Sequence, residues 1–247
     1  MNIRLYILSI LFVLGSVAVS QGQNLSADEY NSEFIWGINK NTSGGLIGGF
    51  ILRKSQRLND RLFESYGIEL QNVKHPVESQ LRTFSGNTVI FGKLNYLYAI
   101  RLQYGRELIL FKKAPQQGVE IKLLTAIGPS IGLQAPYYIE FIRDGGSTSV
   151  REQYNPNKHT INCGASSNCI VGTGYLFQGI HESDIKIGAN AKVGLSFELG
   201  TSKSNVTGFE AGFLVDAYTS EIQLMANADN KSIFPTAFIT LFYGSRR

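Results

Sequence analysis

The sequence has little of several residue types that mark other classes of protein. Charged residues make up only 17% of its 247 residues, compared with roughly 25% in ordinary soluble domains. There are 2 cysteines and 6 prolines, against 43% apolar residues. These proportions exclude a disordered tail, a collagen-like fibre and a small domain held by many disulfides. The net charge of +4 comes from basic residues spread along the chain, which argues against a nucleic-acid-binding protein.

Long hydrophobic runs are also missing after the first 20 residues. At the N-terminus, Arg4 precedes a short apolar run over residues 5–13, and small residues including Ala18 follow it. This layout predicts a cleaved signal peptide over residues 1–20 and a mature domain over residues 21–247. The run is too short for a transmembrane helix. The expected cleavage point has no cysteine, so the sequence does not predict a lipid anchor.

What the sequence does contain is alternation, in which every second residue is apolar over runs much longer than the usual strand of about five or six residues. This pattern is typical of β-strands with one apolar face. Four clear runs and four weaker ones predict eight strands. The clear runs cover residues 98–105, 119–134, 184–199 and 209–218, and the weaker ones cover residues 33–40, 44–54, 61–72 and 233–244.

The connections between these runs alternate in length. Tight polar turns are predicted at residues 55–60, 114–118 and 201–205, and between them lie loops near residues 73–96, 142–183 and 226–232, the first two of them long. Transmembrane barrels have short periplasmic turns and longer extracellular loops. We therefore predict an all-β protein, an eight-stranded antiparallel transmembrane β-barrel with long extracellular loops and both ends of the barrel domain on the periplasmic side.

A soluble β-protein of the periplasm or the medium is the alternative, because soluble sheets also alternate. The apolar faces carry almost no charge, whereas the opposite faces carry glycine and charges of both signs, which suits the narrow interior of a small barrel. Aromatic residues gather near the predicted strand ends, as membrane interfaces favour. They are Trp36, Tyr96, Tyr98, Tyr104, Tyr137, Tyr138, Phe141, Phe242 and Tyr243.

Charged residues on the inward faces form the largest candidate site. They are Glu69, Arg101, Glu107, Glu120, Lys122, Lys186, Lys192, Glu198, Glu210 and Asp216. Because an unpaired charge is costly inside a narrow barrel, we expect a neutralising network that fills the lumen. A conduction path or a polar ligand site is the alternative use of the same charges.

The longest predicted loop contains Cys163 and Cys169, separated by five residues. Two cysteines this close in an oxidising compartment predict a disulfide that stiffens the loop. A metal site made with His159 and His181 is the alternative, although the spacing matches no common zinc signature. We expect no metal and no cofactor.

An enzymatic alternative rests on His181 and Ser183, which would point the same way if they lie on a strand. This pair is slightly similar to the His-x-Ser pattern of lipid A deacylase barrels, without the rest of that motif. The glycine pairs at residues 44–45 and 48–49 do not form a phosphate-binding loop, because no Lys-Ser/Thr and no helix start follow them. His75 is predicted in a loop and has no evident catalytic partner in the sequence. We expect a non-enzymatic protein.

Three segments resemble small outer-membrane β-barrel proteins of Bacteroidota. They are residues 95–107 (NYLYAIRLQYGRE), 191–197 (AKVGLSF) and 242–247 (FYGSRR). The resemblance implies the outer membrane of a Gram-negative bacterium and a place in a larger envelope complex, without giving catalytic residues. The expected partners are outer-membrane lipid, lipopolysaccharide and other outer-membrane proteins, and the expected function is that of a scaffold or accessory subunit.

Overall fold

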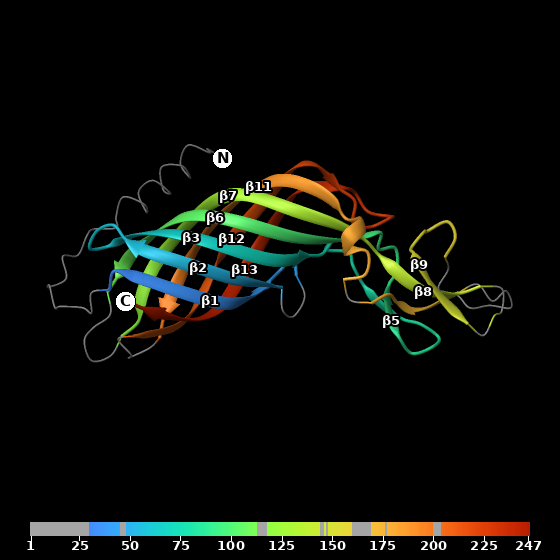
Figure 1. The fold of residues 1–247 in the computed structure, drawn as a ribbon, viewed down its shortest axis with the longest axis horizontal. Helices are drawn as coiled ribbons and strands as arrows, with labels where there is room; N and C mark the ends of the chain where they lie inside the picture. The colour runs from blue at the N-terminus through green and yellow to red at the C-terminus, as the bar shows by residue number, and fades with distance from the viewer. Residues whose placement is uncertain are drawn as a thin grey trace, which may run out of the picture.

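A computed structural model describes the chain over residues 30–44, 48–112, 118–143, 146, 148–159, 169–175, 177–199 and 204–247. The predicted signal peptide at residues 1–20 lies outside the described residues. The main body is a closed antiparallel barrel, with a smaller lobe of β-strands beyond one end (Figure 1). Within the described ranges, no helix has the length and apolar character needed to cross a membrane.

Eight strands form the barrel, as predicted. Their order around the barrel is β1-β13-β12-β11-β7-β6-β3-β2, and β1 pairs with β13 to close it. The strands are β1 (Ser32–Asn41), β2 (Gly49–Arg57), β3 (Leu62–Val73), β6 (Asn95–Phe111), β7 (Glu120–Pro136), β11 (Asp184–Glu198), β12 (Asn205–Ile222) and β13 (Lys231–Arg246). Closure leaves no strand edge with unpaired backbone groups, which is the condition for a sheet to cross hydrocarbon.

The predicted boundaries of β2 are shifted. The sequence predicts a strand over residues 44–54 followed by a turn at residues 55–60, but β2 continues to Arg57, which pairs with Phe63 of β3. The polar residues at the end of β2 keep the alternation and therefore extend the strand. The turn itself is fixed by Asn59, whose side-chain oxygen accepts hydrogen bonds from the backbone N–H groups of Arg61 and Leu62.

Inward glycines allow neighbouring strands to approach closely. A Cβ atom on Gly128 of β7 would lie 1.9 Å from the carbonyl oxygen of Leu102 on β6. On β12, a Cβ atom on Gly212 would lie 2.5 Å from the Cα atom of Gly194 on β11. Larger side chains at these positions would push the strands apart, so the glycine content of the inward faces follows from the narrow barrel.

The sequence predicts two long loops, but the structure shows that both contain regular secondary structure. We call the described parts of residues 74–94 and 137–183 the extracellular module; it is the lobe on the right of Figure 1. It contains two small sheets, β10-β8-β9 and β4-β5, and one short 3₁₀ helix. These elements are β4 (Gln80–Arg82), β5 (Thr88–Ile90), β8 (Tyr138–Ile142), β9 (Ser149–Gln153), β10 (Cys169–Thr173) and η1 (Ile180–Glu182).

The module has a hydrophobic core of its own. Its buried members are Val89, Tyr137, Ile139, Phe141, Tyr154 and Ile170. The core joins the two small sheets, and the backbone N–H of Ile90 donates a hydrogen bond to the Tyr137 hydroxyl at 3.1 Å. The module is therefore a packed unit with a defined shape, mounted on the ends of β3, β6, β7 and β11.

Candidate functional site

The lumen of the barrel is filled by charged side chains in two connected clusters, capped by an apolar plug. At the inner end, Lys122 Nζ lies 3.1 Å from Glu33 Oε1 and 3.5 Å from Glu120 Oε1. Arg246 reaches the same site, with its Nε atom 2.7 Å from Glu33 Oε2 and a further ion pair to Glu198. These residues come from β1, β7, β11 and β13, so the cluster connects strands around the barrel.

Tyr30 lies over this inner cluster, just before β1. Its hydroxyl donates a hydrogen bond to Glu120 Oε1 at 3.0 Å, and the Arg246 guanidinium lies 3.8 Å from the centre of its ring. The ring also stacks on Phe63 with a centroid distance of 4.9 Å. The inner end of the lumen is therefore occupied by both charge and aromatic surface.

Farther along the lumen, Arg101 is the centre of a second cluster and is fully buried. Its Nη1 atom lies 2.8 Å from Glu69 Oε1, its Nε atom lies 2.9 Å from Asp216 Oδ1, and it also contacts Gln71. Lys192 Nζ approaches the other Glu69 oxygen at 3.2 Å. Every charge in this cluster therefore has an opposite partner within hydrogen-bonding distance, as burial requires.

Arg53 links the two clusters. Its Nε atom lies 2.9 Å from Glu107 Oε1, and its guanidinium also pairs with Glu210. Glu107 in turn lies 3.9 Å from Lys122 of the inner cluster, whereas Glu210 lies 4.0 Å from Lys192 of the second cluster. A cavity of about 10 Å³ beside Arg53 has room for roughly one water molecule.

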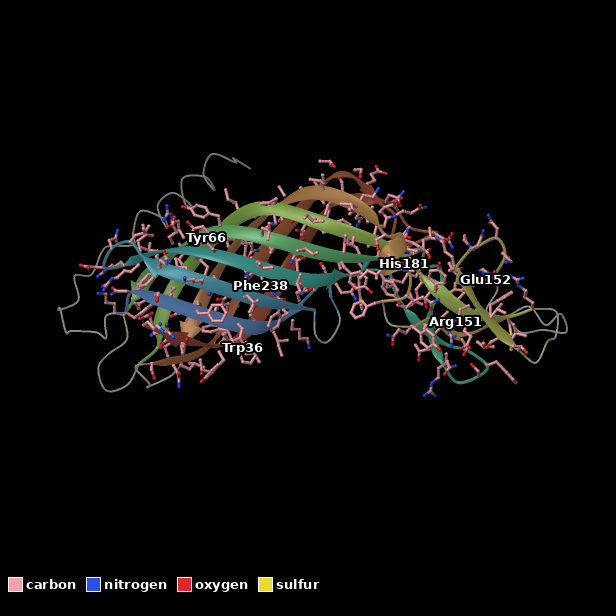
Figure 2. All side chains as sticks on the ribbon, viewed as in Figure 1. Trp36, Tyr66, Arg151, Glu152, His181 and Phe238 are labelled. Carbon is pink, nitrogen blue, oxygen red and sulfur yellow. The ribbon has the colours of Figure 1, made fainter. Side chains whose placement is uncertain are left out.

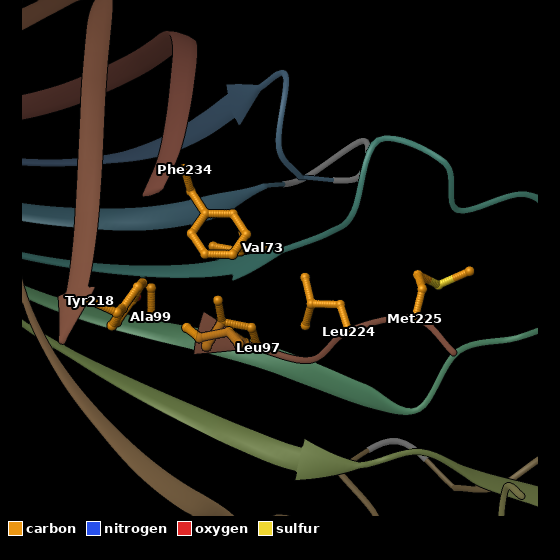
Figure 3. Close-up of a cluster of buried hydrophobic side chains, with 8 residues drawn as sticks. Val73, Leu97, Ala99, Tyr218, Leu224, Met225 and Phe234 are labelled. Atoms are coloured by element: carbon orange, nitrogen blue, oxygen red, sulfur yellow. The ribbon is translucent and has the colours of Figure 1, made fainter. Parts of the chain in front are cut away.

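The outer mouth of the lumen is closed by apolar side chains (Figure 3). The members of this plug are Val73, Leu97, Ala99, Tyr218, Ile222, Leu224, Met225 and Phe234. Leu224 and Met225 come from the loop between β12 and β13, where the Leu224 carbonyl oxygen accepts a hydrogen bond from the Leu94 N–H at 2.8 Å. The plug therefore joins the barrel mouth to the base of the extracellular module.

The predicted lumen charges are placed as expected, with one difference. Glu69, Arg101, Glu107, Glu120, Lys122, Lys192, Glu198, Glu210 and Asp216 are all buried in the network. Lys186 lies on the same face of β11, but it is half-buried near the outer end and has no ion pair with another described residue. It is therefore outside the network that the structure shows.

Sequence reasoning missed Glu33, Arg53 and Arg246, which complete the network. A signal for the first two was present. Glu33 alternates with Phe34, and Arg53 alternates with Leu52, so each charge faces inward where its apolar neighbour faces outward. Arg246 lies two residues beyond the predicted run at residues 233–244. Strand β13 extends to Arg246, and this extension brings the Arg246 side chain into the lumen.

The predicted aromatic positions are only partly correct. Trp36, Tyr104 and Tyr243 lie on the exposed outer wall, and the Trp36 and Tyr243 rings pack edge to face at 6.1 Å. Phe242 instead faces the lumen, because it alternates with Tyr243 along β13. Tyr137 and Phe141 are in the module core, where the chain has already left the barrel.

The cysteine and histidine predictions have separate outcomes. Cys169 is buried at the start of β10, whereas Cys163 lies outside the described residues, so their disulfide stays a prediction. His159 accepts a hydrogen bond from the Asn155 N–H at 2.9 Å and packs on Phe141 at 4.5 Å. Among the residues that the structure describes, no group of three or more His, Cys, Asp or Glu is placed to hold a metal ion.

The structure does not bring His181 and Ser183 together on a strand. His181 lies in η1, where the left-handed backbone of Gly179 (φ 78°) starts a 3₁₀ turn in place of the expected strand. Its Nε2 atom lies 3.1 Å from Glu182 Oε1, and its side chain is 78% exposed (Figure 2). The Ser183 hydroxyl is buried and has no hydrogen-bond partner in the described structure. The geometric premise of the enzymatic alternative is therefore wrong.

Phe84 is the most exposed aromatic side chain among the described residues of the module. Phe84, in the turn between β4 and β5, is 92% exposed. Its neighbours fix this turn to β10, because Thr83 Oγ1 and Asn87 Nδ2 donate hydrogen bonds to the Val171 carbonyl oxygen at 3.1 and 2.9 Å, and Ser85 also contacts that oxygen. Phe84 is thus exposed on a backbone that side-chain hydrogen bonds hold in place.

A charged cluster around Glu152 stabilises the far side of the module. Lys158 Nζ and Arg143 Nη2 donate hydrogen bonds to Glu152 Oε2 at 2.6 and 2.9 Å. Burial raises the pKa of Glu152, but these hydrogen bonds outweigh it and lower the pKa to about 2. Burial also lowers the pKa of His159, although Glu152, 3.2 Å from its Nε2 atom, opposes this shift.

The fold and its surfaces define a class of protein. The barrel is closed, its lumen contains paired charges, and its outer wall exposes large apolar residues such as Ile187, Phe213 and Leu241. An apolar exterior on a closed sheet suits hydrocarbon and not water. The chain is therefore a small outer-membrane-type β-barrel, the class whose single-chain members occupy the outer membranes of Gram-negative bacteria.

Comparisons with known proteins add solved structures but no family. No family model and no curated protein matches the sequence. The structure is similar to the attachment invasion locus protein Ail of Yersinia pestis, with 9% identity over 89% of this chain and 100% of that chain and a TM-score of 0.41. Neisserial surface protein A has 12% identity over 88% and 97% of the two chains with a TM-score of 0.37. The N-terminal barrel domain of Pseudomonas aeruginosa OprF has 10% identity over 88% and 98%, with a TM-score of 0.34.

Proposed function

We propose that the protein is a non-conducting, non-enzymatic barrel of the outer membrane that holds a recognition module at the cell surface. In this proposal it serves as a scaffold or accessory subunit of an outer-membrane protein complex, as the resemblance to Bacteroidota barrels suggests. The barrel fixes the position and orientation of the module. The module then binds another outer-membrane or surface protein.

The exposed side chain of Phe84 on a fixed turn is the observation that carries this proposal. Aromatic residues are enriched among the few side chains that supply most of the energy of a protein interface. A turn that is already ordered loses less conformational entropy when it binds. The hydrogen bonds from Thr83 and Asn87 to β10 provide this order before any partner arrives.

The filled lumen supports the same proposal by limiting the other uses of the barrel. Ion pairs span the lumen, and the apolar plug around Phe234 and Leu224 closes the outer mouth. Solute passage would require both the plug and the charge network to open. The expected result in planar lipid bilayers is the absence of discrete conductance steps, and reproducible single-channel steps would support the channel alternative.

Site-specific crosslinking tests the proposed recognition surface. A photoreactive amino acid would replace Phe84 in a tagged chain, and native membranes that contain this chain would be irradiated. Val150, an exposed residue of the same module, would serve as the matched control position. We expect one dominant protein adduct from position 84 and not from position 150. Equal adduct patterns at the two positions, or no protein adduct at all, would contradict the proposal.

Substitution gives the corresponding measure of affinity. If Phe84 anchors the interface, Phe84→Ala should weaken binding of the crosslinked partner by roughly 2 kcal/mol or more, about 30-fold. Val150→Ala should leave the affinity unchanged. A partner that binds Phe84→Ala as tightly as the unaltered chain would overturn the assignment of Phe84.

A further inference from the structure

An apolar groove runs along the outer wall of the barrel below the extracellular module, and nothing in the proposed recognition surface uses it. Its volume is about 850 Å³, within the range of roughly 300–1,000 Å³ that is usual for ligand pockets. The floor is formed by outward residues of the barrel, and the roof is formed by described residues from the end of β10 to the start of η1, among them Tyr175 and Phe177. The principal lining residues are Phe50, Leu70, Tyr98, Leu133, Phe177 and Ile180.

The roof is held in an unusual backbone conformation. Phe177 has a φ of 61°, and among the described residues it is the one non-glycine residue with a positive φ. A bulky side chain in this region is strained, so the surrounding contacts must hold it. Its ring lies 5.7 Å from the Tyr98 ring on the barrel wall, and the Gln178 side chain accepts a hydrogen bond from the Tyr175 N–H at 2.9 Å. The roof therefore directs Phe177 toward the wall, where it stays half-exposed.

A second apolar groove lies on the same strands, toward the middle of the barrel. Two residues farther along β2, β3 and β6, the side chains of Leu52, Ile68 and Leu102 line this groove, which has a volume of about 600 Å³. Both grooves lie on the face that the barrel turns to the acyl chains of the membrane. Two apolar grooves placed one after the other along the same strands suit an elongated apolar occupant, such as an acyl chain.

A positive charge lies at the outer side of the roof. The Arg151 guanidinium is 3.9 Å from the centre of the Tyr175 ring, and Tyr175 lines the groove. Figure 2 labels Arg151 within the module. The nearest carboxylate partner, Glu140, lies 3.7 Å away, and the Arg151 side chain is still partly exposed. Basic groups next to membrane-facing grooves suit anionic lipid headgroups.

We propose that this groove binds one lipid of the outer leaflet, with an acyl chain between Phe177 and the barrel wall and an anionic headgroup beside Arg151. The inference rests on the membrane location of the barrel and not on the recognition role of Phe84. Bound in this way, the lipid would fill the space between the module and the wall. It would also stabilise the strained roof.

Native mass spectrometry of the full chain tests this proposal. The protein would be reconstituted with equal amounts of phosphatidylglycerol and phosphatidylcholine as probes and released in mild detergent. We expect one retained lipid per chain, with phosphatidylglycerol in excess. Phe177→Gly, which tolerates a positive φ and removes the ring, should lower retention about tenfold. Phe213→Ala, which removes an exposed ring elsewhere on the wall, should retain lipid like the unaltered chain.

A second variant tests the headgroup, and a folding control separates binding from stability. Arg151→Gln should remove the preference for phosphatidylglycerol while one lipid is still retained. Heat-modifiable gel migration should be unchanged in all variants, and crosslinking from position 84 should persist in Phe177→Gly. Equal lipid retention in Phe177→Gly and Phe213→Ala would overturn the proposal. Chain dimers without lipid would also overturn it and would indicate that a second copy occupies the groove.

Discussion

The barrel and the extracellular module have opposite arrangements of polarity. In the barrel, charged side chains such as Arg101 and Glu69 are buried in the lumen, and large apolar residues such as Phe213 face outward. In the module, Ile139 and Phe141 are buried, and charged residues such as Arg143 lie at the surface. The arrangement changes within a few residues of the junction between β7 and β8, so a single chain is folded for two solvents.

This difference indicates where the membrane ends. An apolar surface is stable against acyl chains, and an apolar core is needed only where water surrounds the protein. The charged side chains inside the barrel therefore need ion-pair partners, whereas the module is stabilised by the burial of apolar side chains. The following substitutions test this contrast, beginning with the largest expected effect.

Removing the charge of Arg101 should have the largest effect on the barrel. Arg101→Met leaves Glu69 and Asp216 buried with fewer partners, and breaking a buried ion pair costs about 3–5 kcal/mol. The measurement is urea unfolding in lipid vesicles, followed by Trp36 fluorescence. Arg106→Met on the same strand is the matched control, because the Arg106 side chain is 42% exposed in its pair with Glu64 and such pairs are worth about 1 kcal/mol or less. Equal losses for the two variants would contradict the account of the lumen.

Creating a cavity in the module should destabilise the module alone. Ile139→Ala removes a fully buried side chain, and substitutions of this kind cost about 2–5 kcal/mol. We expect faster proteolysis within the module and unchanged heat-modifiable migration of the barrel. Val150→Ala, at an exposed site on β9, should change neither property. Loss of barrel migration in Ile139→Ala would show that the two regions are not separate units of stability.

A charge on the outer wall should be tolerated far less well than the same charge on the module. Phe213→Arg places a cation against acyl chains, which costs about 2–4 kcal/mol near the centre of the bilayer. Val150→Arg places it at the module surface, where substitutions usually change stability by about 0.5 kcal/mol or less. The measurement is again urea unfolding in vesicles. Similar small effects at both sites would place the outer wall in water.

Acid should weaken the module by a small amount through Glu152. Because the pKa of Glu152 is lowered from 4.5 to about 2, its stabilising contribution is complete above pH 4.5 and is lost as the pH falls toward 2. The effect should be small, since the Lys158 and Arg143 partners are exposed to solvent. Thermal unfolding of the module between pH 6 and pH 2 measures it, and Glu152→Gln should remove this part of the pH dependence. An unaltered chain that follows the same profile as Glu152→Gln would contradict the assignment.

The sequence was sufficient to predict the barrel strands because alternation is a local property. Residues 184–199 show which side chains share a face without any knowledge of their neighbours. The pairs within the lumen are different, because contacts such as Arg53 with Glu210 depend on strand order, register and barrel closure. The sequence therefore predicts most of the charges that face inward, without Glu33, Arg53 and Arg246, but not which of them meet.

The module was not predicted, although part of its signal was present. Tyr137, Ile139 and Phe141 alternate, but only over the five residues 137–141, so the sequence predicts Tyr137 and Phe141 as interfacial aromatic residues near a strand end. Their burial depends on residues from the other long loop, such as Val89. The exposed position of Phe84 likewise depends on hydrogen bonds to β10, which follows 85 residues later in the chain.

Quenching of tryptophan fluorescence tests the outward orientation of the barrel wall most directly, because Trp36 is the single tryptophan of the sequence and lies on the outer face of β1. The protein would be reconstituted without substitution into vesicles with or without brominated acyl chains. We predict strong quenching by the brominated chains and weak quenching by aqueous iodide. Strong quenching by iodide with none by brominated lipid would contradict the claim that the apolar wall faces the membrane.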